Sequence, residues 1–493
     1  MRLAITSNSA SVGNVDIHET FRVIELDAGQ YVETTKSTGL DGRSDSMSFS
    51  REALSAIETQ LAIVVPCKDE AVSILDGVLH GIPHDCLIIL VSNSKKDNFT
   101  AECNLLSDFC TDTRRSGIAC HQHDPGFAEA FVAGGLPAIV RVVNGRPQIR
   151  NGKGEAMMMG AALAKLAGKK YIGFIDADNL VSGAVHEYCK VYAAGLHYAL
   201  HCTGDGGQPD TDAMTPHCMV RIKWNSKPKV KDGIIIFEKL GRSSRVVNQW
   251  MNRLLTTVLG DEPEGNLQLI ETGNAGEHAM SIDLAMDLKF ATGYAVEPFQ
   301  YIDAWERFSG RKFGDPESRL AQQSYDYEFL ANDAAYTSSD ESTLSSSASV
   351  SPISTPATSR PPSLMPALPA HEVRILQVQT RNPHFHDTSK GADHISAMQA
   401  GGLSTIYHSA LTPQDLKDDL RQYFKDNLSD VKGVAEDGTP EAPRCYPSMS
   451  AMDFEVFHAK VKARNETMTV IGECGYNMLG CYQCAVRCMT SSD

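Results

Sequence analysis

The stretch Tyr171-Ile-Gly-Phe-Ile-Asp-Ala-Asp-Asn179 is a short apolar run that ends in two carboxylates. Two similar runs precede it in the chain, Leu61-Ala-Ile-Val-Val65 and Leu87-Ile-Ile-Leu-Val91. Continuous apolar runs of this length, rich in β-branched residues, predict strands that are buried on both faces. Residues 156–167, rich in Ala, Met and Leu and followed by Gly168, predict a helix with a C-terminal glycine. This alternation indicates an α/β fold with a mostly parallel central sheet flanked by helices.

The composition limits the classes of protein to which this chain can belong. Its 493 residues are 42% hydrophobic, which is enough for a sizeable core. The chain has 45 Lys and Arg against 61 Asp and Glu, a net charge of −16, and this balance disfavours nucleic acid as a partner. It has no apolar run of about 18 residues and therefore predicts no membrane span. Thirteen scattered cysteines and no apolar leader indicate reduced thiols and a cytoplasmic location.

Two carboxylates, Asp176 and Asp178, lie directly after the third predicted strand, where open α/β sheets place their ligand sites. Carboxylates at this spacing can hold a hard divalent cation, which in turn neutralises a diphosphate. Aspartate and asparagine are also common in turns that follow strands, so turn chemistry explains the same pattern. The motif alone leaves both explanations open.

Two further segments place a lysine at the end of a strand or at the start of a helix. Pro66-Cys-Lys68-Asp-Glu70 ends the first strand, where a cation and a carboxylate can bind the base or ribose of a nucleotide. Asn151-Gly-Lys153-Gly-Glu155 precedes the predicted helix, and its glycines let backbone N–H groups approach an anion while the lysine adds a point charge. A solvated strand end and a plain glycine-rich turn are the alternatives.

The segment Leu240-Gly-Arg-Ser-Ser-Arg245 precedes apolar residues at helical spacing that end at Gly260. Ser243 or Ser244 is a natural N-cap for the predicted helix. A helix start flanked by arginines and hydroxyls suits a phosphate or a carboxylate of a small ligand. Capping combined with surface arginines is the simpler alternative.

Two groups of potential metal ligands lie in the last quarter of the chain. His384 and His386, in Asn382-Pro-His-Phe-His-Asp387, face the same side of an extended chain and can reach one metal ion. Exposed histidines would have the same spacing. Four cysteines between 474 and 488 lack the two-pair spacing of structural zinc modules, so free thiols are the simpler explanation for them.

In this order, the segments resemble the mannosyl-3-phosphoglycerate synthase family, which are glycosyltransferases of the A-type nucleotide-sugar fold. The resemblance covers roughly residues 60–335 and 371–415. The matching blocks are Val65-Pro-Cys-Lys-Asp-Glu70, Gly152-Lys-Gly-Glu155, Gly173-Phe-Ile-Asp-Ala-Asp-Asn179, Gly183-Ala-Val-His-Glu-Tyr188, Met219-Val-Arg-Ile-Lys-Trp224, Gly241-Arg242, Thr272-Gly-Asn-Ala-Gly-Glu-His-Ala-Met280 and Asn382-Pro-His-Phe-His386.

The resemblance implies transfer of mannose from GDP-mannose to the 2-hydroxyl of 3-phosphoglycerate, with retention at the anomeric carbon. It also implies a divalent metal, Mg²⁺ in the first instance, with Mn²⁺ and Co²⁺ as alternatives. The nucleotide sugar would then contact Pro66, Lys68, Glu70, Lys153, Asp176 and Asp178. The metal would be held by Asp178 with His384 or His386. The acceptor would be surrounded by Arg221, Gly241, Arg242 and Ser244, and catalysis would depend on Asp178, Lys153 and Arg221.

Three other functions are compatible with parts of this pattern. A glucosyl-3-phosphoglycerate synthase or a related transferase is the nearest, because one or two pocket residues can set the choice of sugar. A sugar nucleotidyltransferase also joins a glycine-rich loop and a lysine to an α/β sheet, but its early glycine-rich loop is missing. A non-enzymatic scaffold built on the linker and tail is the third. The implied partners are small molecules, without a membrane, and a homodimer is left open.

Composition also divides the chain into segments. Residues 337–370 are dominated by Ser, Thr and Pro and cannot bury enough apolar surface to become ordered, so we expect a disordered insertion. The predicted organisation is a polar leader (1–58), a nucleotide-sugar and acceptor-binding catalytic domain (59–336), the insertion (337–370), a continuation of the catalytic domain with the histidine segment (371–430), and a C-terminal extension with a Cys-rich end (431–493).

Overall fold

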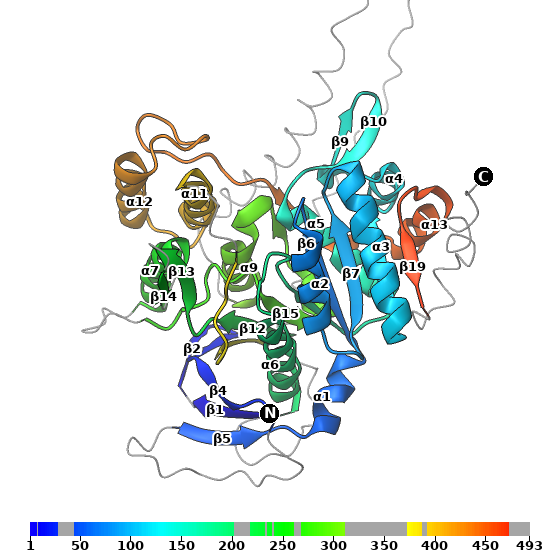
Figure 1. The fold of residues 1–493 in the computed structure, drawn as a ribbon. Coiled ribbons are helices and arrows are strands. Elements are labelled where there is room, and N and C mark those ends of the chain that lie inside the picture. Colours follow the sequence, from blue (N-terminus) through cyan, green and yellow to red (C-terminus); the bar gives the residue numbers. More distant parts are fainter. Residues whose placement is uncertain are drawn as a thin grey trace, which may run out of the picture.

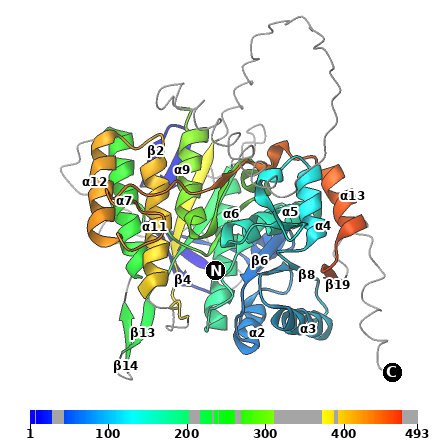
Figure 2. The same ribbon diagram turned by 90° about the horizontal axis from the view of Figure 1, so that it is seen from above.

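A computed structural model describes most of the chain, and Figures 1 and 2 show a large sheet with helices on both of its faces. The insertion predicted at 337–370 and the cysteines between 474 and 488 lie outside the described residues. The structure describes residues 1–6, 8–27, 44–201, 217–231, 234–238, 241–260, 268–310, 372–386 and 392–472.

The central sheet has 13 strands and forms the backbone of the molecule. In spatial order they are β19 (Thr469–Ile471), β8 (Gly117–His121), β7 (Leu87–Ser92), β6 (Leu61–Cys67), β11 (Tyr171–Phe174), β15 (His278–Ser281), β12 (His217–Lys223), β17 (Val373–Gln379), β4 (Phe21–Glu25), β1 (Arg2–Thr6) and β5 (Ser44–Ser48), with β3 (Val15–His18) on β17 and β2 (Ser9–Val12) on β3.

The three strands predicted from apolar runs are confirmed as β6, β7 and β11. Strand β6 lies between the other two and pairs with each of them in parallel. The α/β prediction is therefore confirmed, but the sheet as a whole is mixed. Strand β15 lies antiparallel between β11 and β12, and antiparallel strands extend both edges. Sequence periodicity does not report strand direction, which explains why this mixture was not foreseen.

Both ends of the chain contribute to this sheet. Residues 1–58, interpreted from composition as a polar leader, supply β1 to β5 and helix α1 (Arg51–Glu58). Residues 431–472 of the predicted extension supply β19, which pairs with β8, and helix α13 (Phe454–Arg464), which packs on α4. These strands are short and partly exposed, so their apolar signal is weak.

The helices cover two faces of the sheet, and each face has its own apolar core. Successive residues of β6 point into opposite cores. Leu61 and Ile63 lie in one core, and Ala62 and Val64 lie in the other. One face carries α1, α2 (Val72–Gly81), α3 (Lys96–Thr113) and α6 (Ser182–His201); the other carries α4 (Pro125–Ala133), α5 (Lys153–Leu166), α7 (Arg242–Leu259), α8 (Ile282–Asp287), α9 (Val296–Phe308), α11 (Ala392–His408), α12 (Gln414–Asn427) and α13.

Short elements complete the described structure. The predicted helix at 156–167 is confirmed as α5, and none of the described helices is long and apolar enough to cross a membrane. Figure 2 shows the hairpin of β13 and β14 projecting from the body beside α7. The small strand pairs are β9 (Val140–Val143) with β10 (Arg146–Ile149), β13 (Lys227–Lys231) with β14 (Ile234–Glu238), and β16 (Phe290–Ala291) with β18 (Cys445–Tyr446); three 3₁₀ turns are η1 (Pro137–Ile139), η2 (Gly293–Ala295) and η3 (Met449–Ala451).

Candidate active site

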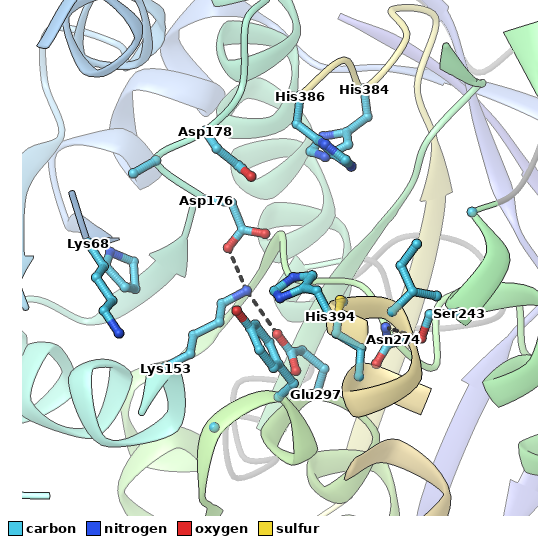
Figure 3. Close-up of a pocket in the computed structure, with 18 of the residues that line it drawn as sticks. Lys68, Lys153, Asp176, Asp178, Ser243, Asn274, Glu297, His384, His386 and His394 are labelled. Carbon is cyan, nitrogen blue, oxygen red and sulfur yellow. Dashed lines mark hydrogen bonds and ion pairs between the residues drawn. The ribbon is translucent and has the colours of Figure 1, made fainter. Parts of the chain in front are cut away.

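A pocket of about 620 Å³ lies where the parallel strands β6, β7, β8 and β11 end. Strand ends form one side of it, and the start of α7, the β13–β14 hairpin and α11 form the other. Figure 3 shows Lys68 at one end of the pocket and Ser243 with Asn274 at the other, with Lys153 between them. The predicted site residues that line it are Pro66, Lys68, Glu70, Lys153, Asp176, Asp178, Gly241, Arg242, Ser244, His384 and His386.

The loop after β6 is fixed by hydrogen bonds to the loop after β7. Asp69 has a left-handed backbone with φ of 57°, and its N–H donates to Ser94 Oγ at 2.6 Å. Its carboxylate accepts bonds from the Lys95 N–H at 3.0 Å and from Asn98 Nδ2 at 2.7 Å. These bonds hold Pro66 to Glu70 in place along the pocket wall.

The glycine-rich loop ahead of α5 is folded around the buried carboxylate of Glu155. Gly152 has φ of 154°, and a Cβ there would lie 1.9 Å from Glu155 Oε2, so only glycine fits. Glu155 accepts hydrogen bonds from Thr292 Oγ1 at 2.5 Å and from Tyr446 Oη at 2.6 Å. The carboxylate thereby joins three distant parts of the chain beneath the start of α5.

Lys153, the first residue of α5, is held between two carboxylates (Figure 3). Its Nζ lies 2.5 Å from Asp176 Oδ1 and 2.9 Å from Glu297 Oε1. Burial alone would lower the pKa of Lys153, but the two carboxylates outweigh burial and hold it well above its usual range. A Cβ at Gly276 would lie 2.5 Å from Asp176 Oδ2 and 2.7 Å from Lys153 Nζ, so a larger residue at 276 would displace this ion pair.

The second aspartate and the histidine pair are brought together by backbone pairing. Asn179 and His386 form an antiparallel bridge, and the Leu180 N–H donates to the Phe385 carbonyl at 2.8 Å. This pairing places the segment after β11 beside the segment that follows β17. Asp178, His384 and His386 therefore line the same pocket, although 206 and 208 positions separate the histidines from the aspartate (384 − 178 and 386 − 178).

The imidazole of His384 is fixed on several sides. Its ring stacks on Trp224 with centroids 4.4 Å apart, and its Nδ1 lies 3.5 Å from Glu277 Oε1. Glu277 Oε2 accepts a 2.9 Å hydrogen bond from Trp224 Nε1. Burial, with the nearby Asp176 carboxylate, raises the pKa of Glu277 to about 8. The pKa of His384 is well below its usual range because the ring is buried and Lys227 and His386 are close.

The donor set suits a divalent metal in type but is incomplete. One carboxylate and two imidazoles are ligands that Mn²⁺ and similar ions accept. Within the described part of the chain, however, no three His, Cys, Asp or Glu side chains lie close enough to hold a metal ion by themselves. A ligand that supplies further oxygens would therefore be needed to complete such a site.

The start of α7 forms the opposite end of the pocket. The prediction that Ser243 or Ser244 caps this helix is wrong, since the N-cap is Gly241 and it makes no side-chain capping bond. Both serines lie buried in the first turn, whereas Arg242 is exposed. The first-turn N–H groups therefore remain available to an anion.

Arg221 was predicted to contact the acceptor, but it does not line the pocket. It lies on β12, its side chain is fully buried, and its guanidinium sits 4.6 Å from the centre of the Tyr301 ring. It donates to the carbonyls of Thr272 at 3.1 Å and Glu297 at 3.1 Å. Arg221 therefore supports the wall that carries Glu297 and does not present a charge to a ligand.

Among the polar pocket residues that were not identified from sequence are Glu297, His394, Gln122 and Lys227. Glu297 follows a stretch without a motif, and His394 lies on α11 after the predicted insertion. Gln122 is buried, and it donates to the Arg150 carbonyl at 2.6 Å and the Gly152 carbonyl at 3.2 Å. Its Oε1 finds no partner among the described residues and can accept a hydrogen bond from a ligand. The fourth, Lys227, lies just beyond a matching block, which is the one signal that could have found it.

Comparison with known proteins decides the family. A sequence profile of mannosyl-3-phosphoglycerate synthase matches residues 5–461. The chain belongs to this family. A mannosyl-3-phosphoglycerate synthase of Pyrococcus furiosus is 31% identical over 465 residues, covering 93% of this chain and 97% of that protein. One of Aeropyrum pernix is 27% identical over 450 residues, covering 90% and 93%. The predicted family is thereby confirmed, and so is the predicted class of enzyme, a glycosyltransferase.

Solved structures with a similar course of the chain include a glucosyl-3-phosphoglycerate synthase of Mycobacterium tuberculosis in complex with Mn²⁺, UDP-glucose and phosphoglyceric acid. It is 16% identical, with a TM-score of 0.41, and the match covers 82% of this chain and 95% of that one. A second mycobacterial protein is 15% identical with a TM-score of 0.43, covering 83% and 94%.

Proposed function

We propose that the protein transfers mannose from GDP-mannose to the 2-hydroxyl of 3-phosphoglycerate, releases GDP and acts in the cytoplasm. The observation that carries this proposal is the position of Lys153, held by Asp176 and Glu297 midway between two dissimilar ends of one pocket. Family membership supplies the reaction class, and the pocket offers separate places for a nucleotide and for a small anion.

The nucleotide sugar is assigned to the end formed by the parallel strands. Pro66, Lys68 and Glu70 line this end, on a loop that is fixed by Asp69. Gln122 adds an acceptor whose orientation is set, because its amide nitrogen already donates to two carbonyls. A guanine base offers N–H donors to such an oxygen. The diphosphate and sugar would then lie toward Lys153 and Asp176.

The acceptor is assigned to the start of α7. Gly241, Arg242 and Ser244 surround the uncapped first turn of this helix. Backbone N–H groups and the helix dipole favour a phosphate or carboxylate there. Both anionic groups of 3-phosphoglycerate suit such a site, and its hydroxyl would point back toward the sugar.

A divalent metal is assigned to Asp178 with His384 or His386, and oxygens of the diphosphate would complete its coordination. Mg²⁺, Mn²⁺ and Co²⁺ all accept this mixture of ligands to different degrees. When bound, the metal would neutralise charge on the departing diphosphate. The chain's own contribution is to hold the aspartate and the histidines on paired segments.

Retention of configuration is best explained by attack of the acceptor hydroxyl on the face from which GDP leaves. Asp176 and Glu297 are the carboxylates nearest to the assigned sugar position, and both are engaged in ion pairs with Lys153. A carboxylate held in this way is a poor nucleophile. The arrangement therefore supports same-face transfer without a covalent intermediate on the protein.

The proposal is tested by incubating the protein with a panel of nucleotide sugars, 3-phosphoglycerate and each divalent cation. We expect GDP release and a phosphorylated glycoside with GDP-mannose, and neither product without a metal or without acceptor. Preference for GDP-glucose or UDP-glucose would reassign the sugar specificity. Absence of glycoside with every donor and cation would contradict the proposal.

Asp178→Asn should reduce kcat by at least about a hundredfold, because it removes charge from the assigned metal ligand. The fold should be unaffected, since Asp178 lies at the pocket wall. Calorimetric titration of Mn²⁺ in the presence of GDP should show weakened binding as well. Metal affinity and turnover equal to those of the unchanged protein would remove Asp178 from the site.

A further inference from the structure

A lysine from the β13–β14 hairpin lies against the first residues of α7. Lys227 Nζ is 4.3 Å from the centre of the Trp224 ring. A Cβ placed on Gly241, the N-cap of α7, would lie 3.3 Å from Lys227 Cδ and 3.8 Å from its Nζ. The ammonium group is therefore positioned over the helix start and inside the pocket, which Lys227 lines.

Positive charge accumulates around this position. The uncapped N-terminus of α7 carries a partial charge of about +0.5, and a cation beside it is unfavourable by itself. Arg242 and Arg245 lie on the first turn of the same helix. Lys229 also lines the pocket, but it forms an ion pair with Glu238, whose carboxylate offsets part of the charge. An anion bound between Lys227 and the helix start would interact favourably with both of them.

A second observation indicates that a ligand occupies this end. Asn274 is only 6% exposed and lines the pocket, and its Nδ2 donates to Ser243 Oγ at 3.4 Å. Its Oδ1 has no hydrogen-bond partner within the described residues. A buried amide oxygen without a partner is costly, and a hydroxyl group of a bound molecule would satisfy it.

We propose that Lys227 is an acceptor-binding residue. Its ammonium group and the start of α7 bind an anionic group of the acceptor, and Asn274 Oδ1 accepts a hydrogen bond from an acceptor hydroxyl. Trp224 holds the lysine side chain in place through its ring face. This inference rests on the proposed function, because it assigns a further residue to the acceptor of that reaction.

The first test measures steady-state kinetics of Lys227→Met and Lys227→Arg beside a control variant, Lys460→Met. Loss of a charge-assisted contact should raise KM for 3-phosphoglycerate by at least about tenfold and leave KM for GDP-mannose within about twofold. Lys227→Arg should retain most of the affinity. Lys460 lies on α13 and pairs with Glu129, so its variant should behave like the unchanged protein. An unchanged KM for 3-phosphoglycerate in Lys227→Met would overturn the inference.

The second test uses the contact between Lys227 and Gly241. Gly241 has φ of −64°, which alanine adopts without strain, but the added Cβ would press on the lysine side chain. Gly241→Ala should therefore raise KM for 3-phosphoglycerate about threefold in the unchanged protein and have almost no effect in Lys227→Met. Equal effects in both backgrounds would show that the lysine plays no part.

The third test is independent of sugar transfer. Calorimetric titrations of 3-phosphoglycerate, glycerol 3-phosphate and D-glycerate are made into the protein with GDP and Mn²⁺ present. The ligand whose affinity falls most in Lys227→Met identifies the group that the lysine binds, phosphate or carboxylate. If the unchanged protein binds 3-phosphoglycerate but forms no glycoside, the proposed reaction fails, while weaker binding by Lys227→Met still supports the inference. Equal binding by both proteins overturns the inference alone.

Discussion

The two lysines of the pocket have opposite surroundings. The side chain of Lys153 is 14% exposed, and two carboxylates of the protein neutralise it at 2.5 and 2.9 Å. Lys227 is half-buried, rests on an aromatic ring and lies beside a helix N-terminus with arginines nearby. The first lysine is part of the framework, whereas the second lies where an anionic group of a ligand would contact both its ammonium group and the helix start. A cation in a binding pocket can thus be a structural element or a recognition element, and its surroundings tell which.

Lys153→Met should have the largest effect, and it tests whether Lys153 is a framework residue. It leaves the buried carboxylate of Glu297 and the partly exposed carboxylate of Asp176 without their partner, which should cost about 3–5 kcal/mol of unfolding free energy. Activity should fall at least about a hundredfold. Lys227→Met should cost less than about 1 kcal/mol, because partly exposed charges contribute little to stability. Urea denaturation of both variants provides the measurement.

A triple variant provides the control for Lys153→Met. Lys153→Met combined with Asp176→Asn and Glu297→Gln removes the unpaired charges and should recover most of the lost stability without activity. If the single variant is as stable as the unchanged protein, Lys153 is not a framework residue.

His278 makes the stability of the protein depend on pH. The side chain of His278 is buried. Burial, together with the charges of Arg221 and Lys153, keeps its pKa well below 6.5. The unfolded chain therefore takes up a proton first as the pH falls. Stability from this residue is present above about pH 6.5 and is lost below it, at up to about 1.4 kcal/mol per pH unit.

The check on His278 is denaturation of His278→Asn between pH 5 and pH 8. Below pH 6.5 the unfolding free energy of this variant should decline less steeply than that of the unchanged protein, by up to about 1.4 kcal/mol per pH unit. Parallel pH profiles would show that His278 does not titrate differently in the folded and unfolded states.

Glu238→Gln should have the smallest effect, and it tests whether the charges of the β13–β14 hairpin near Lys227 act on the acceptor. The substitution removes the carboxylate that pairs with Lys229 and makes the pocket around Lys227 more positive. KM for 3-phosphoglycerate should fall about twofold at low salt, and the difference should disappear at high ionic strength. A rise in KM would mean that the hairpin charges do not act on the acceptor.

The sequence predicts the strand-end half of the site well. Buried strands have strong apolar runs, and their carboxyl ends meet at one edge, so Lys68, Asp176 and Asp178 could be placed beside one another. The helix-start half depends on tertiary contacts. Neither spacing nor composition shows that Lys227 reaches Gly241, or that Arg221 is turned into the core toward Tyr301.

The edge strands could not be predicted from the sequence either. Strands β1 to β5 are short and partly exposed, and strand β19 has three half-buried residues. Their place in the sheet is set by partners far along the chain. The pairing of Asn179 with His386 is similar, because the residues contribute no periodic signal that links them.

The pairing of β4 with β17 has a consequence for synthesis of the chain. Phe21 pairs with Val378, so the amino-terminal strands cannot join the sheet until a late part of the chain has been made. At about 5–20 residues per second, that interval is on the order of 20–70 seconds. During it, the free edge of β4 can pair with other nascent chains. Production of this protein in a heterologous host should therefore be limited by chaperone capacity and improve when translation is slowed or cooled.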